Sequence, residues 1–128
     1  MRKEVLLWWE QAQKDLEVAE KNLKIEEYYV TAFFCQQAVE KALKALFILK
    51  MAKSPGQTHS LIYLGSGVGV PKELFGFLQI LTPEFITTRY PDVVQEVPYK
   101  LYNNEIARSY LTNAKVLFKW IANQISKH

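Results

Sequence analysis

Three segments of the chain carry apolar residues that recur every three or four positions, and this spacing limits the fold more than any other feature. In two of them, near residues 3–24 and 103–126, the steps alternate strictly between four and three. Such a repeat places the apolar side chains on one face of an α-helix and predicts that this face is buried against other helices. The two stripes are Val5, Trp9, Ala12, Leu16, Ala19 and Leu23, and Ala107, Leu111, Ala114, Phe118, Ile121 and Ile125.

A third long helix is predicted over residues 26–51, and it ends before the turn signal Pro55-Gly56. A short helical segment is expected at residues 59–64, with Thr58 as a reasonable N-cap. The glycine-rich stretch 65–70, "GSGVGV", is interpreted as a flexible link.

A further short helix is predicted up to residue 81, with Pro71 at its first position, where a helix tolerates proline. Residues 83–98 contain three prolines and show no helical period, so we expect an irregular segment there. Loops of this length are usually functional or disordered. The last long helix begins at Asn103 or Asn104, either of which is a suitable N-cap.

These elements predict an all-α fold: an antiparallel up-and-down bundle of four long or medium helices plus one short helix, in a single domain over residues 1–128. The composition, 49% hydrophobic and 23% charged, is that of a globular protein. No segment is apolar enough to span a membrane and no signal peptide is visible, so a cytoplasmic location is expected. One cysteine and two histidines leave no zinc-binding pattern, and we expect neither a metal nor a cofactor.

The polar residues of the segment 26–51 are the first candidates for a binding site. Gln36 and Gln37 interrupt residues that otherwise look like core, so they either satisfy buried partners or line a cleft. Gln37, Lys41 and Lys44 follow the spacing i, i+4, i+7. This spacing presents one amide and two ammonium groups on one helix face, which could hold a phosphate or simply a neighbouring helix.

Three further residues outside that segment are candidates. His59 is the only internal histidine; it either titrates in a site or bonds a nearby carbonyl or carboxylate. Arg89, in "TRYPD", either binds an anion or pairs with Asp92. Arg108 opens a basic stripe on the last helix, which either faces phosphate or is a solvated surface.

The motifs "QQAVEKALKA", "THSL" and "TRYPD", with the paired tryptophans of the first helix, resemble the small prokaryotic HEPN proteins of the nucleotidyltransferase-associated type. The resemblance covers nearly the whole chain. It implies a homodimer and a role in binding nucleotide or RNA, or in presenting substrate to a minimal nucleotidyltransferase. In toxin–antitoxin pairs of this family, some HEPN members are metal-independent ribonuclease toxins.

The ribonuclease branch carries an arginine, four to six residues and then a histidine on the last long helix. Here Arg108 matches the arginine, but Asn113 stands where the histidine is expected, after "SYLT". An asparagine amide cannot exchange a proton near neutral pH. We therefore expect a non-catalytic subunit that binds nucleotide, RNA or a partner enzyme, with Gln36, Gln37, Lys41, Lys44, His59, Arg89 and Arg108 as ligand-binding residues.

Two alternatives to this function stay open. The first is a degenerate ribonuclease that uses Arg108 with Asn113, or with His59 if that side chain lies near Arg89 or Arg108 in space. The second is a purely structural dimeric scaffold without a small ligand.

Overall fold

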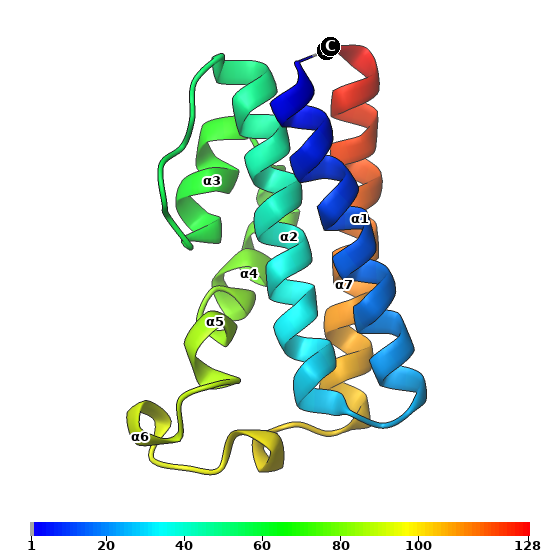
Figure 1. Cartoon of the computed structure of the whole chain (residues 1–128), viewed down its shortest axis with the longest axis vertical. Helices are drawn as coiled ribbons and strands as arrows, with labels where there is room; N and C mark the ends of the chain where they lie inside the picture. Colours follow the sequence, from blue (N-terminus) through cyan, green and yellow to red (C-terminus); the bar gives the residue numbers. More distant parts are fainter. Residues whose placement is uncertain (1) are drawn as a thin grey trace.

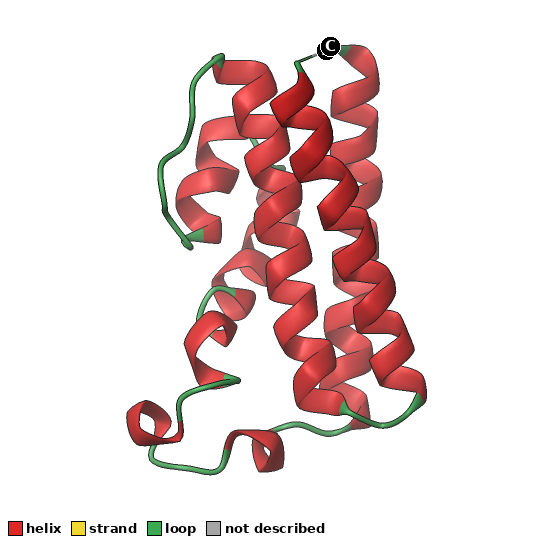
Figure 2. Cartoon of the chain, in the orientation of Figure 1, coloured by secondary structure: helices red, strands yellow, loops and turns green. Residues whose placement is uncertain are grey.

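The computed structural model describes residues 2–128, and its regular elements within this range are all helical (Figure 2). Three long helices are accompanied by shorter ones that lie between the second and third long helix along the chain. The elements are α1 (Lys3–Lys24), α2 (Tyr28–Met51), α3 (Leu61–Val68), α4 (Lys72–Leu81), α5 (Glu84–Thr87), α6 (Pro91–Val94), the 3₁₀-helix η1 (Pro98–Leu101) and α7 (Asn104–Lys127).

The helices form the predicted up-and-down bundle, with α2 at its centre. Helices α1, α2 and α7 run side by side along the long axis, and α1 is antiparallel to the other two (Figure 1). Helix α3 packs on α2, and α4 and α5 bring the chain back toward the end where α1 joins α2 (Figure 1). Because α2 contacts α1, α3, α5 and α7, its side chains are buried on several sides.

The core lies where the predicted stripes meet. Alanines at 12, 19, 38, 42 and 114 are fully buried and allow the long helices to approach closely. Larger side chains fill the space between them, among them Leu43, Leu46, Leu117 and Ile121. Trp9 stacks on Phe118 with a ring-centroid distance of 5.5 Å, which joins α1 to α7.

The start and the end of α3 differ from the sequence-based expectation. The N-cap is Ser60, whose hydroxyl accepts a hydrogen bond from the Tyr63 amide, whereas the Thr58 hydroxyl accepts from the Ser60 amide. Residues 65–68 are helical, so the prediction of a flexible link over 65–70 was wrong for most of its length. The helix ends at Gly69, whose φ of 77° is the left-handed conformation that glycine adopts without strain.

The stretch 83–98 is also more ordered than expected, because it contains the one-turn helices α5 and α6. Proline precedes or opens each of them, since its fixed φ suits the first turn of a helix. Helix α6 buries none of its residues and packs on α5, away from the main bundle (Figure 1). In the described part of the chain, no helix has the length and apolarity that a bilayer crossing requires.

Candidate functional site

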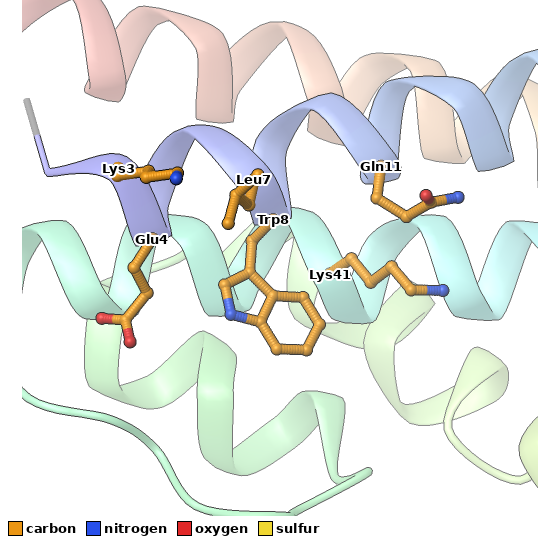
Figure 3. Close-up of a pocket in the computed structure, with 6 residues that line it drawn as sticks. All are labelled: Lys3, Glu4, Leu7, Trp8, Gln11 and Lys41. Carbon is orange, nitrogen blue, oxygen red and sulfur yellow. The ribbon is translucent and has the colours of Figure 1, made fainter.

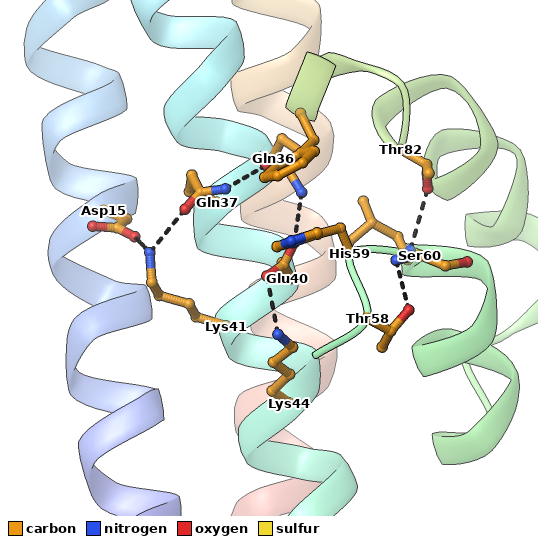
Figure 4. Close-up of polar contacts among 12 residues, drawn as sticks. Asp15, Gln36, Gln37, Glu40, Lys41, Lys44, Thr58, His59, Ser60 and Thr82 are labelled. Atoms are coloured by element: carbon orange, nitrogen blue, oxygen red, sulfur yellow. Dashed lines mark hydrogen bonds and ion pairs between the residues drawn. The ribbon is translucent and has the colours of Figure 1, made fainter. Parts of the chain in front are cut away.

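A chain of polar side chains crosses the bundle from α1 over α2 to the loop before α3 (Figure 4). It begins at Asp15 of α1, whose carboxylate accepts a hydrogen bond from the Lys41 ammonium. Lys41 also donates to Gln37 Oε1 at 3.2 Å, and Gln37 Nε2 donates to Gln36 Oε1 at 2.7 Å. Gln36 Nε2 then donates to Glu40 Oε1 at 2.9 Å, so both ends of each amide are used.

Glu40 is the hub of this polar chain. Its Oε2 accepts from Lys44 Nζ at 3.1 Å, and its Oε1 also lies 3.0 Å from His59 Nδ1. The carboxylate is only 6% exposed, so the ammonium of Lys44, which is equally buried, balances a charge that burial would otherwise make costly. The hub thereby ties the loop before α3 to the middle of α2.

The two glutamines therefore have a defined place. Gln36 is fully buried, and its amide joins Gln37 to Glu40, so its oxygen and its nitrogen each have a hydrogen-bond partner. Asp15, which the sequence analysis did not single out, is buried and anchors the other end. The sequence does indicate that Asp15 is near the core, because it lies three residues after Ala12 and four before Ala19, beside the buried stripe.

His59 and Arg89 both contact the ring of Phe85. The imidazole stacks on that ring with a centroid distance of 3.8 Å and an interplanar angle of 17°. The guanidinium carbon of Arg89 lies 4.3 Å from the Phe85 centroid, and the Arg89 Nε donates to the Phe85 carbonyl. Among residues 2–128, Arg89 has no carboxylate partner, so the alternative of a pair with Asp92 is not what the structure shows.

A surface groove lies beside the hub, with a volume of about 380 Å³. Trp8 forms one side of it, and the Lys44 ammonium lies 5.2 Å from the centroid of that indole. The half-exposed imidazole of His59 also lines it. The full lining is Trp8, Glu40, Lys41, Lys44, Gly56, Gln57 and His59.

A second groove, of about 660 Å³, adjoins the first because it shares Trp8 and Lys41 with it. Its other residues come from the first two turns and the middle of α1: Lys3, Glu4, Leu7 and Gln11 (Figure 3). Leu7 is strongly exposed there, so the surface around Trp8 combines apolar area with ammonium groups.

Arg108 lies apart from the other candidates. It is exposed in a cleft between the C-terminal part of α1 and the start of α7, where its Nε donates to Asn104 Oδ1 at 3.3 Å. Lys115 in the same cleft is paired with Glu20 at 2.7 Å. Asn113 donates to the carbonyl of Ser109 on its own helix. Six of the seven predicted ligand-binding residues thus converge around Glu40 and Phe85, and Arg108 does not.

Two further buried groups are chemically notable. Burial raises the pKa of the Cys35 thiol to about 12, so this thiol is not a nucleophile at neutral pH. Glu84 accepts hydrogen bonds from Tyr102 and Tyr110, and its burial raises the pKa of its carboxyl. Desolvation and the neighbouring Glu84 raise the pKa of both phenols.

Within residues 2–128, no group of three histidine, cysteine or carboxylate side chains could hold a metal ion.

The fold and this polar chain define a class of protein: a small helical bundle whose central helix bears a Gln-Gln-Ala-x-Glu-Lys motif that is tied to a Thr-His-Ser loop. The family model described as HEPN domain matches residues 5–125, and the chain belongs to this family. A search of curated proteins finds no match.

Two solved structures are similar over nearly their whole length. One is TT1696 from Thermus thermophilus, with 29% sequence identity, a TM-score of 0.86, and coverage of 96% of this chain and 99% of that one. The other is ST0689, an archaeal HEPN homologue, with 29% identity, a TM-score of 0.81, and coverage of 97% and 99%.

Proposed function

We propose that this chain is a non-catalytic HEPN subunit that binds a nucleotide or the end of an RNA in the groove beside Trp8. Three of the candidate side chains, Lys41, Lys44 and His59, line this groove together with Trp8, and this arrangement carries the proposal. The groove has the size of a small-molecule site, and it combines an indole with amide, imidazole and ammonium groups. The indole of Trp8, which is partly exposed, offers a nucleobase a stacking surface worth about 1–3 kcal/mol.

The charges around the groove indicate where a phosphate would bind. Asp15 and Glu40 already balance Lys41 and Lys44, so these two lysines offer little unpaired charge. Arg89 differs, because its guanidinium rests on aromatic rings and has no carboxylate partner in residues 2–128. A guanidinium that is held in this way is well suited to phosphate. We therefore assign the phosphate to Arg89. This residue does not line the groove itself, but it contacts Phe85, the ring on which the groove residue His59 stacks.

Thermal unfolding with added nucleotide tests this assignment, because a ligand of the folded state raises the melting temperature by mass action. AMP, ATP and a short single-stranded RNA should raise it for the wild type, and Arg89→Ala should weaken that binding about tenfold or more. Lys72→Ala removes an exposed cation from α4 and serves as the matched control. If none of these ligands raises the melting temperature, the purely structural scaffold is favoured.

The absence of a histidine after Arg108 on the body of α7 supports the non-catalytic part of the proposal. Asn113 uses its amide on its own helix, where it cannot transfer a proton. A metal-independent ribonuclease is the second candidate. His59 and Arg89, which both contact the ring of Phe85, are the pair that a relocated version of it would use. Cleavage of labelled RNA in EDTA distinguishes the two.

Wild-type cleavage that is lost in His59→Ala would establish the relocated ribonuclease, and loss in Arg108→Ala would place catalysis on α7. The proposed non-catalytic subunit predicts no cleavage by any of these proteins. If Asn113→His then gains cleavage, the scaffold of the ribonuclease branch is intact and only its proton-transfer group is missing.

The proposal includes a homodimer and a minimal nucleotidyltransferase as partner, in a toxin–antitoxin type of pair. An exposed apolar surface supports a protein partner, because large apolar side chains are concentrated in residues 86–101. They are Ile86, Tyr90, Val93, Val97, Tyr99 and Leu101. Light scattering after gel filtration measures the dimer directly, and a monomer at micromolar concentration would contradict it.

A further inference from the structure

The hydrogen bonds around Glu40 fix which nitrogen of His59 carries a proton. Gln36 and Lys44 both donate to Glu40, so this side chain accepts as a carboxylate. A carboxylate has no hydrogen to donate, and His59 Nδ1 lies 3.0 Å from Oε1. The hydrogen of that bond must therefore sit on Nδ1, which leaves Nε2 as the nitrogen available to a ligand.

The position of the ring is fixed as well as its tautomer. Phe85 covers one face of the imidazole at 3.8 Å, and Glu40 holds the Nδ1 edge. The side chain is nevertheless 47% exposed and lines the groove together with Trp8. No hydrogen bond within residues 2–128 uses Nε2, so the ring offers one oriented polar atom to an occupant of the groove.

We propose that His59 Nε2 binds a ribose hydroxyl of the ligand, with Glu40 as the positioning residue. This inference rests on the proposed function, whose phosphate is assigned to Arg89. A hydroxyl both donates and accepts, so it can pair with Nε2 whether or not that nitrogen is protonated. A phosphate could pair with Nε2 only when the ring is charged. The ligand class is therefore a ribonucleotide with its hydroxyl intact.

The expected selectivity follows from the value of one hydrogen bond. A neutral hydrogen bond contributes a net factor of roughly two to ten in affinity, and an unpaired polar group left in the site increases the loss. Calorimetry with AMP, 2′-deoxy-AMP and 3′-deoxy-AMP measures the three affinities. One of the two deoxy nucleotides should bind the wild type about three- to tenfold more weakly than AMP.

His59→Phe tests the assignment, because phenylalanine can keep the stacking on Phe85 but has no ring nitrogen. This variant should bind all three nucleotides with equal affinity. The matched control is His128→Phe, which changes the only other histidine and should keep the wild-type selectivity. Equal binding of the three nucleotides by the wild type would overturn the inference but leave the proposed function in place. Selectivity that survives in His59→Phe would also overturn it.

If the proposed function is wrong, the result is different: neither AMP nor its deoxy analogues would bind at all, and the inference would fail as well.

A measurement without ligand tests the role of Glu40. The ¹⁵N chemical shifts of His59 should show a proton on Nδ1 in the wild type, and Glu40→Gln should release this preference. A wild-type ring protonated on Nε2 alone would contradict the inference, whether or not Glu40→Gln folds.

Discussion

At the scale of single residues, Gln36 illustrates how a buried amide in a core helix is accommodated. Its oxygen and nitrogen join Gln37 to Glu40, so neither of these buried atoms lacks a hydrogen-bond partner. We expect Gln36→Leu to lower the free energy of unfolding by about 1–3 kcal/mol, because both neighbours lose a partner in a buried site. Urea unfolding measures this change.

The matched control for that variant is Gln13→Leu on the exposed side of α1, which should change the free energy of unfolding by less than about 0.5 kcal/mol. An equal effect of the two substitutions would show that the polar chain contributes nothing to stability. Both chains should remain helical by circular dichroism.

Glu84 carries the pH dependence that the structure predicts most clearly. Desolvation raises the pKa of its carboxyl above the ordinary 4.5, against the opposing hydrogen bonds from Tyr102 and Tyr110. The folded state therefore favours the protonated form. The contribution of protonated Glu84 to the stability of the fold is fully present below pH 4.5. It is lost as the pH rises through the pKa of Glu84 in the folded state.

Glu84→Gln removes this titration while keeping the shape of the side chain. The stability of the wild type should fall relative to this variant as the pH rises from 4.5 toward neutrality. Urea unfolding of both proteins at a series of pH values gives the difference. A difference that does not change with pH, or that changes in the opposite direction, would contradict the assignment.

At the scale of elements, the long helices were predictable and the short ones only in part. The apolar stripe predicted the bounds of α1 correctly. The N-cap of α7 is Asn103, one of the two residues expected there. The glycine-rich part of α3 was missed, because its glycines serve close packing and not chain flexibility. A Cβ on Gly67 would lie 2.7 Å from the ring of Phe47, so only glycine fits there without a shift.

This packing gives a prediction for α3 with an internal control in α4. Gly67→Ala should lower the free energy of unfolding by about 1–3 kcal/mol, since a rigid ring must move. Gly76→Ala meets nothing within 4 Å and should raise it by about 0.5–1 kcal/mol. Thermal unfolding of the two variants shows whether each substitution lowers or raises stability. Stabilisation by both substitutions would contradict the packing of α3 on α2.

At the scale of the whole molecule, the sequence predicted which polar side chains share a helix face but not which partners they would have. Gln37, Lys41 and Lys44 share a helix face as expected, but both lysines are neutralised by carboxylates, one of them from α1. The pairing of Lys41 with Asp15 joins residues 26 positions apart, which no local pattern reveals. The stacking of His59 on Phe85 likewise depends on how α5 packs against the loop before α3, and it joins residues 26 positions apart.

The central claim is that the ligand binds beside Trp8 and not in the cleft of Arg108. The most direct test is an NMR titration of the ¹⁵N-labelled protein with AMP. The chain has three tryptophans, so the indole signals of Trp8, Trp9 and Trp120 can be compared in one spectrum. We expect the Trp8 indole and the Gly56 amide to shift while the Trp120 indole and the amides around Asn104 and Arg108 do not. Shifts confined to Asn104, Arg108 and Lys115 would contradict the account.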